Sequence, residues 1–235
     1  MNHEDYWKDI DQHLIDLVEN GFVKLPSLSQ FTLNDISKNI SDEMIGNTFS
    51  ELSLTHSIFL KNLAVEKYLT PRLFNLAKDI FSYKGSISNQ YHIARRVNPG
   101  NSKEMYRAHF DSHLFTMVLP IKIPKPLSKG TAGELIYFPK ARKSPKNEIH
   151  NFIGKASYKR FSSKEGIEKF SKIKKQRVDN FEDYRPLLFF GNTTLHTNKQ
   201  VSADCSSYRL TLLAHFFDPS PKYGVGEILR LIRSR

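Results

Sequence analysis

The sequence predicts one mainly β domain with helices in its N-terminal third. A chain of 235 residues is long enough for a single domain with a substantial core. Apolar residues recur at helical spacing up to about residue 81, and from Ser86 the period changes to that of strands. The composition, 39% hydrophobic and 12% aromatic, is that of a globular protein and excludes a disordered chain.

The division expected along the chain 1–235 has three parts. Residues 1–85 form a helical support that includes a first strand, residues 86–217 form the core with a basic insert at 143–185, and residues 218–235 form a basic tail. We expect a single domain, because all-β chains of this size are commonly single domains.

The N-terminal part begins with an amphipathic pattern over residues 4–20, which predicts a helix that ends at Asn20-Gly21. Phe22-Val-Lys-Leu-Pro26 then predicts a strand. A second helix is expected over residues 33–46, with Thr32 or Asn34 as its cap.

Helical periodicity then continues over residues 55–81. Thr70-Pro71 interrupts this pattern, and because proline is favoured in the first turn of a helix, it marks the start of a new one.

The strand pattern begins with residues 88–97, which end in a Pro99-Gly100 turn. Alternation places either Tyr91 and Arg95 or His92 and Arg96 on the inner face, and the sequence leaves both choices open. Further strands are expected at residues 114–123, 133–139, 186–190 and 208–214.

A candidate metal site lies just ahead of the second of these strands. His109 and Asp111 are two residues apart, so an extended chain directs both side chains to one face. An imidazole and a carboxylate form two thirds of a facial triad, which holds Fe(II) and leaves coordination positions open. The best third ligand is His196, which follows the apolar strand at 186–190 and a Gly-Asn turn.

The last predicted strand carries Arg209 and Thr211 on one face, among the leucines at positions 210, 212 and 213. A buried, unpaired arginine is costly, so this position favours an anionic ligand. A guanidinium matches a carboxylate through two parallel, charge-assisted hydrogen bonds.

The ordered set of His109-x-Asp111, His196, Arg209 and Thr211 resembles the Fe(II)/2-oxoglutarate-dependent dioxygenase superfamily, most of all its phytanoyl-CoA-dioxygenase-like branch of small-molecule hydroxylases. The resemblance covers roughly residues 88 to 217 and implies a double-stranded β-helix, a jelly-roll or cupin-like barrel, braced by the N-terminal helices. It also implies Fe(II), 2-oxoglutarate as cosubstrate and O₂.

The resemblance further implies a role for each matching residue. The triad would be the catalytic metal site, and Arg209 with Thr211 would bind the cosubstrate. The presence of Asp111 favours hydroxylation or desaturation, because related halogenases lack this carboxylate. Further candidates are Asn198 and Tyr91 for the cosubstrate, and Arg95 and Arg142 for the substrate, with Arg142 at the end of a Gly-Glu strand.

The charge of the protein indicates what kind of substrate it binds. The formal net charge is +11, and residues 155–177 hold nine cations against two acids. This segment is either a solvated face or a lid that attracts an anionic substrate. The function expected is therefore hydroxylation of an anionic small molecule, with release of succinate and CO₂.

Two alternatives stay open: an oxygenase of the same fold that modifies a macromolecule, and a non-catalytic protein that binds nucleic acid or another polyanion. Nucleic-acid demethylases of the superfamily carry a further Arg after the cosubstrate Arg, whereas Ala214-His215-Phe216 follows here. The JmjC-type relatives and prolyl hydroxylases generally use Lys at the position of Arg209.

A cytoplasmic location is expected from three features. The N-terminus lacks a basic region followed by an apolar stretch, and no window approaches the apolar length of a membrane span. Cys205 is the one cysteine, so it cannot form an internal disulfide, which suits a reducing compartment.

Overall fold

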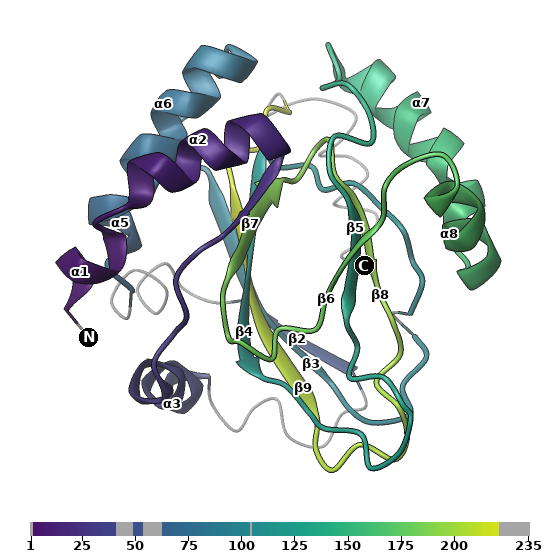
Figure 1. The fold of residues 1–235 in the computed structure, drawn as a ribbon. Coiled ribbons are helices and arrows are strands. Elements are labelled where there is room, and N and C mark those ends of the chain that lie inside the picture. Colours follow the sequence, from purple (N-terminus) through teal and green to yellow (C-terminus); the bar gives the residue numbers. More distant parts are fainter. Residues whose placement is uncertain (1, 41–48, 54–62, 104, 221–235) are drawn as a thin grey trace.

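The computed structural model describes residues 2–40, 49–53, 63–103 and 105–220 (Figure 1). The helices are α1 (His3–Trp7), α2 (Ile10–Asn20), α3 (Gln30–Asn39), α5 (Val65–Tyr68), α6 (Thr70–Phe81), α7 (Glu148–Tyr158) and α8 (Lys164–Ser171), with a 3₁₀ turn, η2, at Lys159–Phe161. The strands are β1 (Phe22–Lys24), β2 (Phe49–Ser53), β3 (Gln90–Val97), β4 (Phe115–Lys122), β5 (Leu135–Phe138), β6 (Arg177–Asp179), β7 (Leu187–Phe190), β8 (Leu195–Asn198) and β9 (Arg209–Phe216).

These strands form two antiparallel sheets. The larger has the order β1-β7-β4-β9-β3-β2, and the smaller has the order β6-β5-β8. Val118 of β4 and Phe189 of β7 pack with Leu135 and Tyr137 of β5, so one buried cluster joins the two sheets. The mainly β class with antiparallel sheets and flanking helices is confirmed, whereas closure of the sheets into a barrel stays a prediction.

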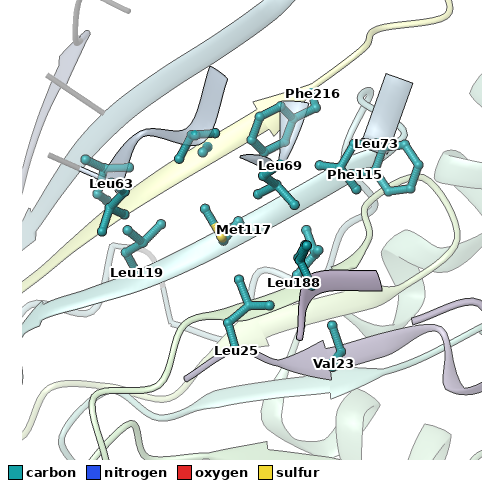
Figure 2. Packing of buried hydrophobic residues seen from close by; sticks show 14 of the residues in the cluster. Val23, Leu25, Leu63, Leu69, Leu73, Phe115, Met117, Leu119, Leu188 and Phe216 are labelled. Atoms are coloured by element: carbon teal, nitrogen blue, oxygen red, sulfur yellow. The ribbon is translucent and has the colours of Figure 1, made fainter. Parts of the chain in front are cut away.

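The outer face of the larger sheet is covered by the N-terminal helices (Figure 1). Phe115, Met117 and Leu119 alternate along β4 toward this side, where they join Leu69 and Leu73 of the helical layer in one buried cluster (Figure 2). Because strand side chains alternate between faces, Thr116 and Val118 are left for the space between the sheets.

The N-terminal helices begin and end partly where the sequence predicts. Gly21, in the left-handed conformation with a φ of 81°, ends α2, and its N–H donates to the carbonyl of Leu17. The expected single helix over residues 4–20 is instead two helices, α1 and α2.

The predicted break at Thr70-Pro71 is confirmed, because α6 begins at Thr70 with the proline in its first turn. The predicted cap of α3 is wrong. Ser29, rather than Thr32 or Asn34, accepts from the backbone N–H of Thr32, and α3 spans Gln30–Asn39. The rest of the predicted range 33–46 reaches residues that lie outside the described part of the chain.

The basic segment 143–185 contains more structure than expected. Its helices α7 and α8 lie over the smaller sheet (Figure 1). Phe161, Ile167 and Phe170 pack there against Phe138 and Leu195. Ser163 caps α8 by accepting from Gly166 N–H, whereas the preceding Ser162 donates its hydroxyl to the carbonyl of Ala108.

The sequence-based prediction also missed three elements of the structure, namely strands β2 and β6 and helix α7. The predicted basic tail at 218–235 lies mostly outside the described residues, which end at Ser220. Within the described ranges, no helix combines the length and the apolar character that crossing a bilayer requires.

Alternation along β9 selects the side chains that face the interior. Leu210, Leu212, Ala214 and Phe216 join the helical layer, so the other face carries Arg209, Thr211, Leu213 and His215. The register pairs Tyr91 with His215 and Arg95 with Thr211, which places the two β3 residues on that inner face. His92 and Arg96 point the other way, against the rings of Phe216 and Tyr208.

The contact between the helical layer and the larger sheet predicts a stability difference within α6. Leu73 is fully buried, whereas Ile80 of the same helix is 44% exposed. We expect Leu73→Ala to lower the free energy of unfolding by about 2–5 kcal/mol and Ile80→Ala by less than about 0.5 kcal/mol. Urea denaturation followed by circular dichroism measures both, and equal effects would contradict this packing.

Candidate metal centre

The two candidate histidines are brought together by their own backbones. The N–H of His109 donates to the carbonyl of His196 at 3.0 Å, and the N–H of His196 donates back to the carbonyl of His109 at 3.1 Å. This antiparallel bridge sets the imidazoles side by side, with ring centroids 4.3 Å apart. A third backbone bond, from Asp111 N–H to Gly191 O at 3.0 Å, holds the carboxylate residue beside them.

The potential ligand atoms of His109, Asp111 and His196 all lie within 4.8 Å of one another. Asp111 Oδ1 is 3.7 Å from the Nε2 atom of each imidazole. The Nδ1 atoms point instead at backbone carbonyls, that of Arg107 at 2.8 Å and that of Thr194 at 3.2 Å. This favours the tautomer with a proton on Nδ1, which leaves each Nε2 lone pair free to bind a metal.

The second oxygen of Asp111 is held by a different pair of residues. Thr116 Oγ1 donates to Asp111 Oδ2 at 2.5 Å and lies 3.1 Å from Nδ1 of His215. His215 Nδ1 is itself 3.8 Å from Asp111 Oδ2. The carboxylate is thereby oriented with Oδ1 toward the histidines.

Gly191 allows this close packing. A Cβ atom there would lie 2.6 Å from Thr116 Oγ1, 2.8 Å from the carbonyl of His113 and 3.1 Å from the Cβ of Asp111. Any larger residue would therefore push the Asp111 turn away from the site.

The protonation states of Asp111 and His109 favour the binding of a metal cation. Burial raises the pKa of Asp111, but the imidazoles of His196, His215 and His109 and the Thr116 hydroxyl outweigh it and hold this pKa well below its usual range. Burial of the His109 ring lowers its pKa, and the neighbouring imidazole of His196 lowers this pKa further. An ionised carboxylate beside a neutral imidazole is the state that a divalent metal requires.

Arg209 lies in the same cavity as the triad. Its side chain is almost fully buried, and Nη1 donates to Asn198 Oδ1 at 3.2 Å. Burial and the charge of Arg95 lower the pKa of Arg209 to about 10, so the guanidinium is still protonated at neutral pH. Thr211, on the same face of β9, also lines the cavity.

The remaining predicted residues are distributed differently. Arg95 lines the cavity and forms an ion pair with Glu51 of β2. Tyr91 is 46% exposed, and its ring lies nearly parallel to those of His113 and His215.

Arg142 is not among the residues that line the cavity. Its guanidinium lies 4.0 Å from the ring centroid of Phe110 and donates to Asn192 O and Asn151 Oδ1. Sequence reasoning missed Thr116 and His215. His215 lies four residues after Thr211 on the same strand, so alternation could have placed it on the inner face, whereas no recognised site residue shares the strand of Thr116.

The donor set fits a divalent transition metal. Two imidazole nitrogens and one carboxylate oxygen form the facial arrangement typical of non-haem Fe(II) sites. Across the described ranges, this is the one group of three His, Cys, Asp or Glu side chains with such spacing.

The chain matches no protein-family model and no curated relative. Solved structures with the same fold include a prolyl-4-hydroxylase from Pseudomonas putida, 12% identical over 87% of this chain and 96% of that one, with a TM-score of 0.53. The Fe(II)/α-ketoglutarate-dependent dioxygenase TqaL is 10% identical over 94% and 90%, with a TM-score of 0.56. HygX from Streptomyces hygroscopicus, solved with nickel and 2-oxoglutarate bound, is 10% identical over 90% and 87%, with a TM-score of 0.53. This chain therefore shares its fold with oxygenases that use 2-oxoglutarate.

The hydrogen bond from Thr116 to Asp111 predicts a selective effect on metal affinity. Thr116→Val keeps the shape of the side chain but removes the donor, so we expect Co(II) or Fe(II) to bind about 10–100-fold more weakly. Thr197→Val is the matched control, because this buried hydroxyl has no hydrogen-bond partner. Calorimetric titration measures both affinities, and equal values for the two variants would refute the role of Thr116.

Proposed function

We propose that this protein is an Fe(II)- and 2-oxoglutarate-dependent oxygenase that hydroxylates a small anionic molecule and releases succinate and CO₂. The observation that carries the proposal is the buried guanidinium of Arg209 in the cavity that holds the His109, Asp111 and His196 ligand atoms. A metal-binding triad alone serves many reactions, whereas a fixed interior cation suits a cosubstrate with a carboxylate at each end.

His109 Nε2, His196 Nε2 and Asp111 Oδ1 would hold the iron. When bound, iron and O₂ supply the oxidising power that decarboxylates 2-oxoglutarate and oxidises a C–H bond of the substrate. The chain contributes the fixed geometry: the histidine Nδ1 atoms and Asp111 Oδ2 are already occupied by protein groups, which leaves three donor atoms facing one point.

Arg209 would bind the far carboxylate of 2-oxoglutarate through paired N–H donors. Asn198 accepts from Nη1 and so orients the guanidinium, and Thr211 offers a hydroxyl on the same face. Because Arg209 and Thr211 are both nearly inaccessible to water, their bonds to a carboxylate would be strong.

An anionic substrate is supported by Arg95, the other arginine of the cavity. Its present partner is Glu51 on the edge strand β2, and a substrate carboxylate or phosphate could replace that acid. The half-exposed ring of Tyr91 would contact the rest of the substrate. Use of Arg209 rather than Lys supports the phytanoyl-CoA-dioxygenase-like branch. We assign no substrate role to Arg142, since its guanidinium donates to Asn192 O and Asn151 Oδ1, lies over the ring of Phe110 and is not among the residues that line the cavity.

The first test is spectroscopic. Purified protein supplied with Fe(II) and 2-oxoglutarate without oxygen should develop the weak visible absorption of an iron–keto acid chelate. His196→Ala should abolish this absorption, because it removes one of the three ligands. A folded wild-type sample that shows none would contradict the proposed function.

The second test separates the cosubstrate site from the metal site. Arg209→Ala should weaken 2-oxoglutarate binding by about 30-fold or more, the loss expected for a charge-assisted pair, while metal affinity stays unchanged. Arg96→Ala is the control, since Arg96 lies on the opposite face of β3 against Tyr208. Titrations with 2-oxoglutarate and with Fe(II), followed by the visible absorption, give the cosubstrate affinity and the metal affinity of each variant. An unchanged affinity of Arg209→Ala for 2-oxoglutarate would refute the assignment.

A further inference from the structure

We propose that the exposed face of α7 docks onto an anionic lipid membrane. Three large apolar side chains of this helix point into solvent: Ile149 is 69% exposed, Phe152 61% and Ile153 59%. They occupy positions i, i+3 and i+4, which form one continuous stripe on a helix. Scattered apolar residues are common on surfaces, but a stripe of this size marks an interaction site.

The orientation of α7 is fixed by its other face. Asn151 Oδ1 accepts from Arg142 Nη2 at 2.7 Å, Lys155 Nζ donates to Ser112 Oγ at 3.1 Å, and Tyr158 OH donates to Ala141 O at 3.1 Å. Polar side chains therefore hold the helix against the protein while its apolar side chains face outward. Rotating α7 to bury the stripe would break all these bonds.

The charge around the stripe is strongly positive. Residues 140–160 contain seven cations and one acid, Glu148, which gives a net charge of +6. Lys143, Lys146, Lys159 and Arg160 of this segment are exposed. Lys143 and Lys146 also line a surface hollow together with His150 of α7.

This combination favours an anionic bilayer over other partners. Aliphatic and aromatic side chains of an interfacial helix enter the boundary between headgroups and acyl chains, while nearby Lys and Arg bind anionic headgroups. A nucleic acid would use the cations but leave Ile149 and Ile153 without a suitable contact. A second copy of this chain would bring two positively charged faces together.

The docking surface is joined to the metal motif. Ser112, which accepts from Lys155, follows Asp111 directly, and the ring of Phe110 packs against Tyr158 with centroids 4.9 Å apart. Helix α7 therefore contacts the motif through the face opposite the exposed stripe. The proposal rests on the surface alone and is independent of the proposed reaction.

The test is co-sedimentation of the full-length, metal-free protein with vesicles. We expect binding to phosphatidylcholine vesicles that contain phosphatidylglycerol and little binding to pure phosphatidylcholine. Phe152→Ser/Ile153→Ser should lower the partition coefficient by about tenfold or more, because it removes two inserting side chains. Lys143→Gln and Lys146→Gln should each lower it by about fivefold.

The control variant is Phe31→Ser, which changes an equally exposed phenylalanine on α3, 73% exposed, and should bind like the wild type. Three results would overturn the proposal: no binding to the anionic vesicles, wild-type binding by the double variant, or an equal loss with Phe31→Ser. A wild-type dimer in solution that the double variant dissociates would also overturn it, in favour of a second copy as the occupant. Because no iron or 2-oxoglutarate is present, failure here leaves the proposed oxygenase reaction untouched.

Discussion

The site depends on the pair of backbone hydrogen bonds between His109 and His196. These bonds join a segment that precedes β4 of the larger sheet to β8 of the smaller one, and they carry both imidazoles to the same side. Gly191 extends this arrangement, since its carbonyl accepts from Asp111 and its missing side chain leaves room for Thr116. A metal site that is fixed by main-chain pairing requires little reorganisation when an ion binds.

Around the His109–His196 bridge, the strands of the larger sheet place polar side chains on one face and apolar side chains on the other. On β4 and β9, one face supplies the core under the N-terminal helices and the other supplies Thr116, Arg209, Thr211 and His215. A strand slipped by one residue would exchange the two sets and, in β9, would bury Arg209 under the helices. The extensive apolar contacts of the outer face therefore fix the register that the inner, polar face needs.

Much of this arrangement could be predicted from sequence, because its signals are local. The spacing of His109 and Asp111 and the arginine among leucines in β9 are visible without a structure, and so are Gly21 and Pro71 at helix ends. Thr116 and His215 could not be recognised as partners of Asp111, since their role depends on pairing between distant strands. The inward direction of Tyr91 and Arg95 likewise depends on the register with β9.

Helix α7 could not have been oriented from its sequence, because Asn151 and Lys155 face the protein while Ile149, Phe152 and Ile153 face solvent, the reverse of the usual pattern. The central claim, that one cavity holds a metal and a dicarboxylate together, is tested most directly by a crystal structure obtained anaerobically with Fe(II) and 2-oxoglutarate. We expect one ion bonded to His109 Nε2, His196 Nε2 and Asp111 Oδ1, with the far carboxylate of 2-oxoglutarate on the Arg209 guanidinium. An ion bound by other residues, or a carboxylate bound away from Arg209, would contradict this account.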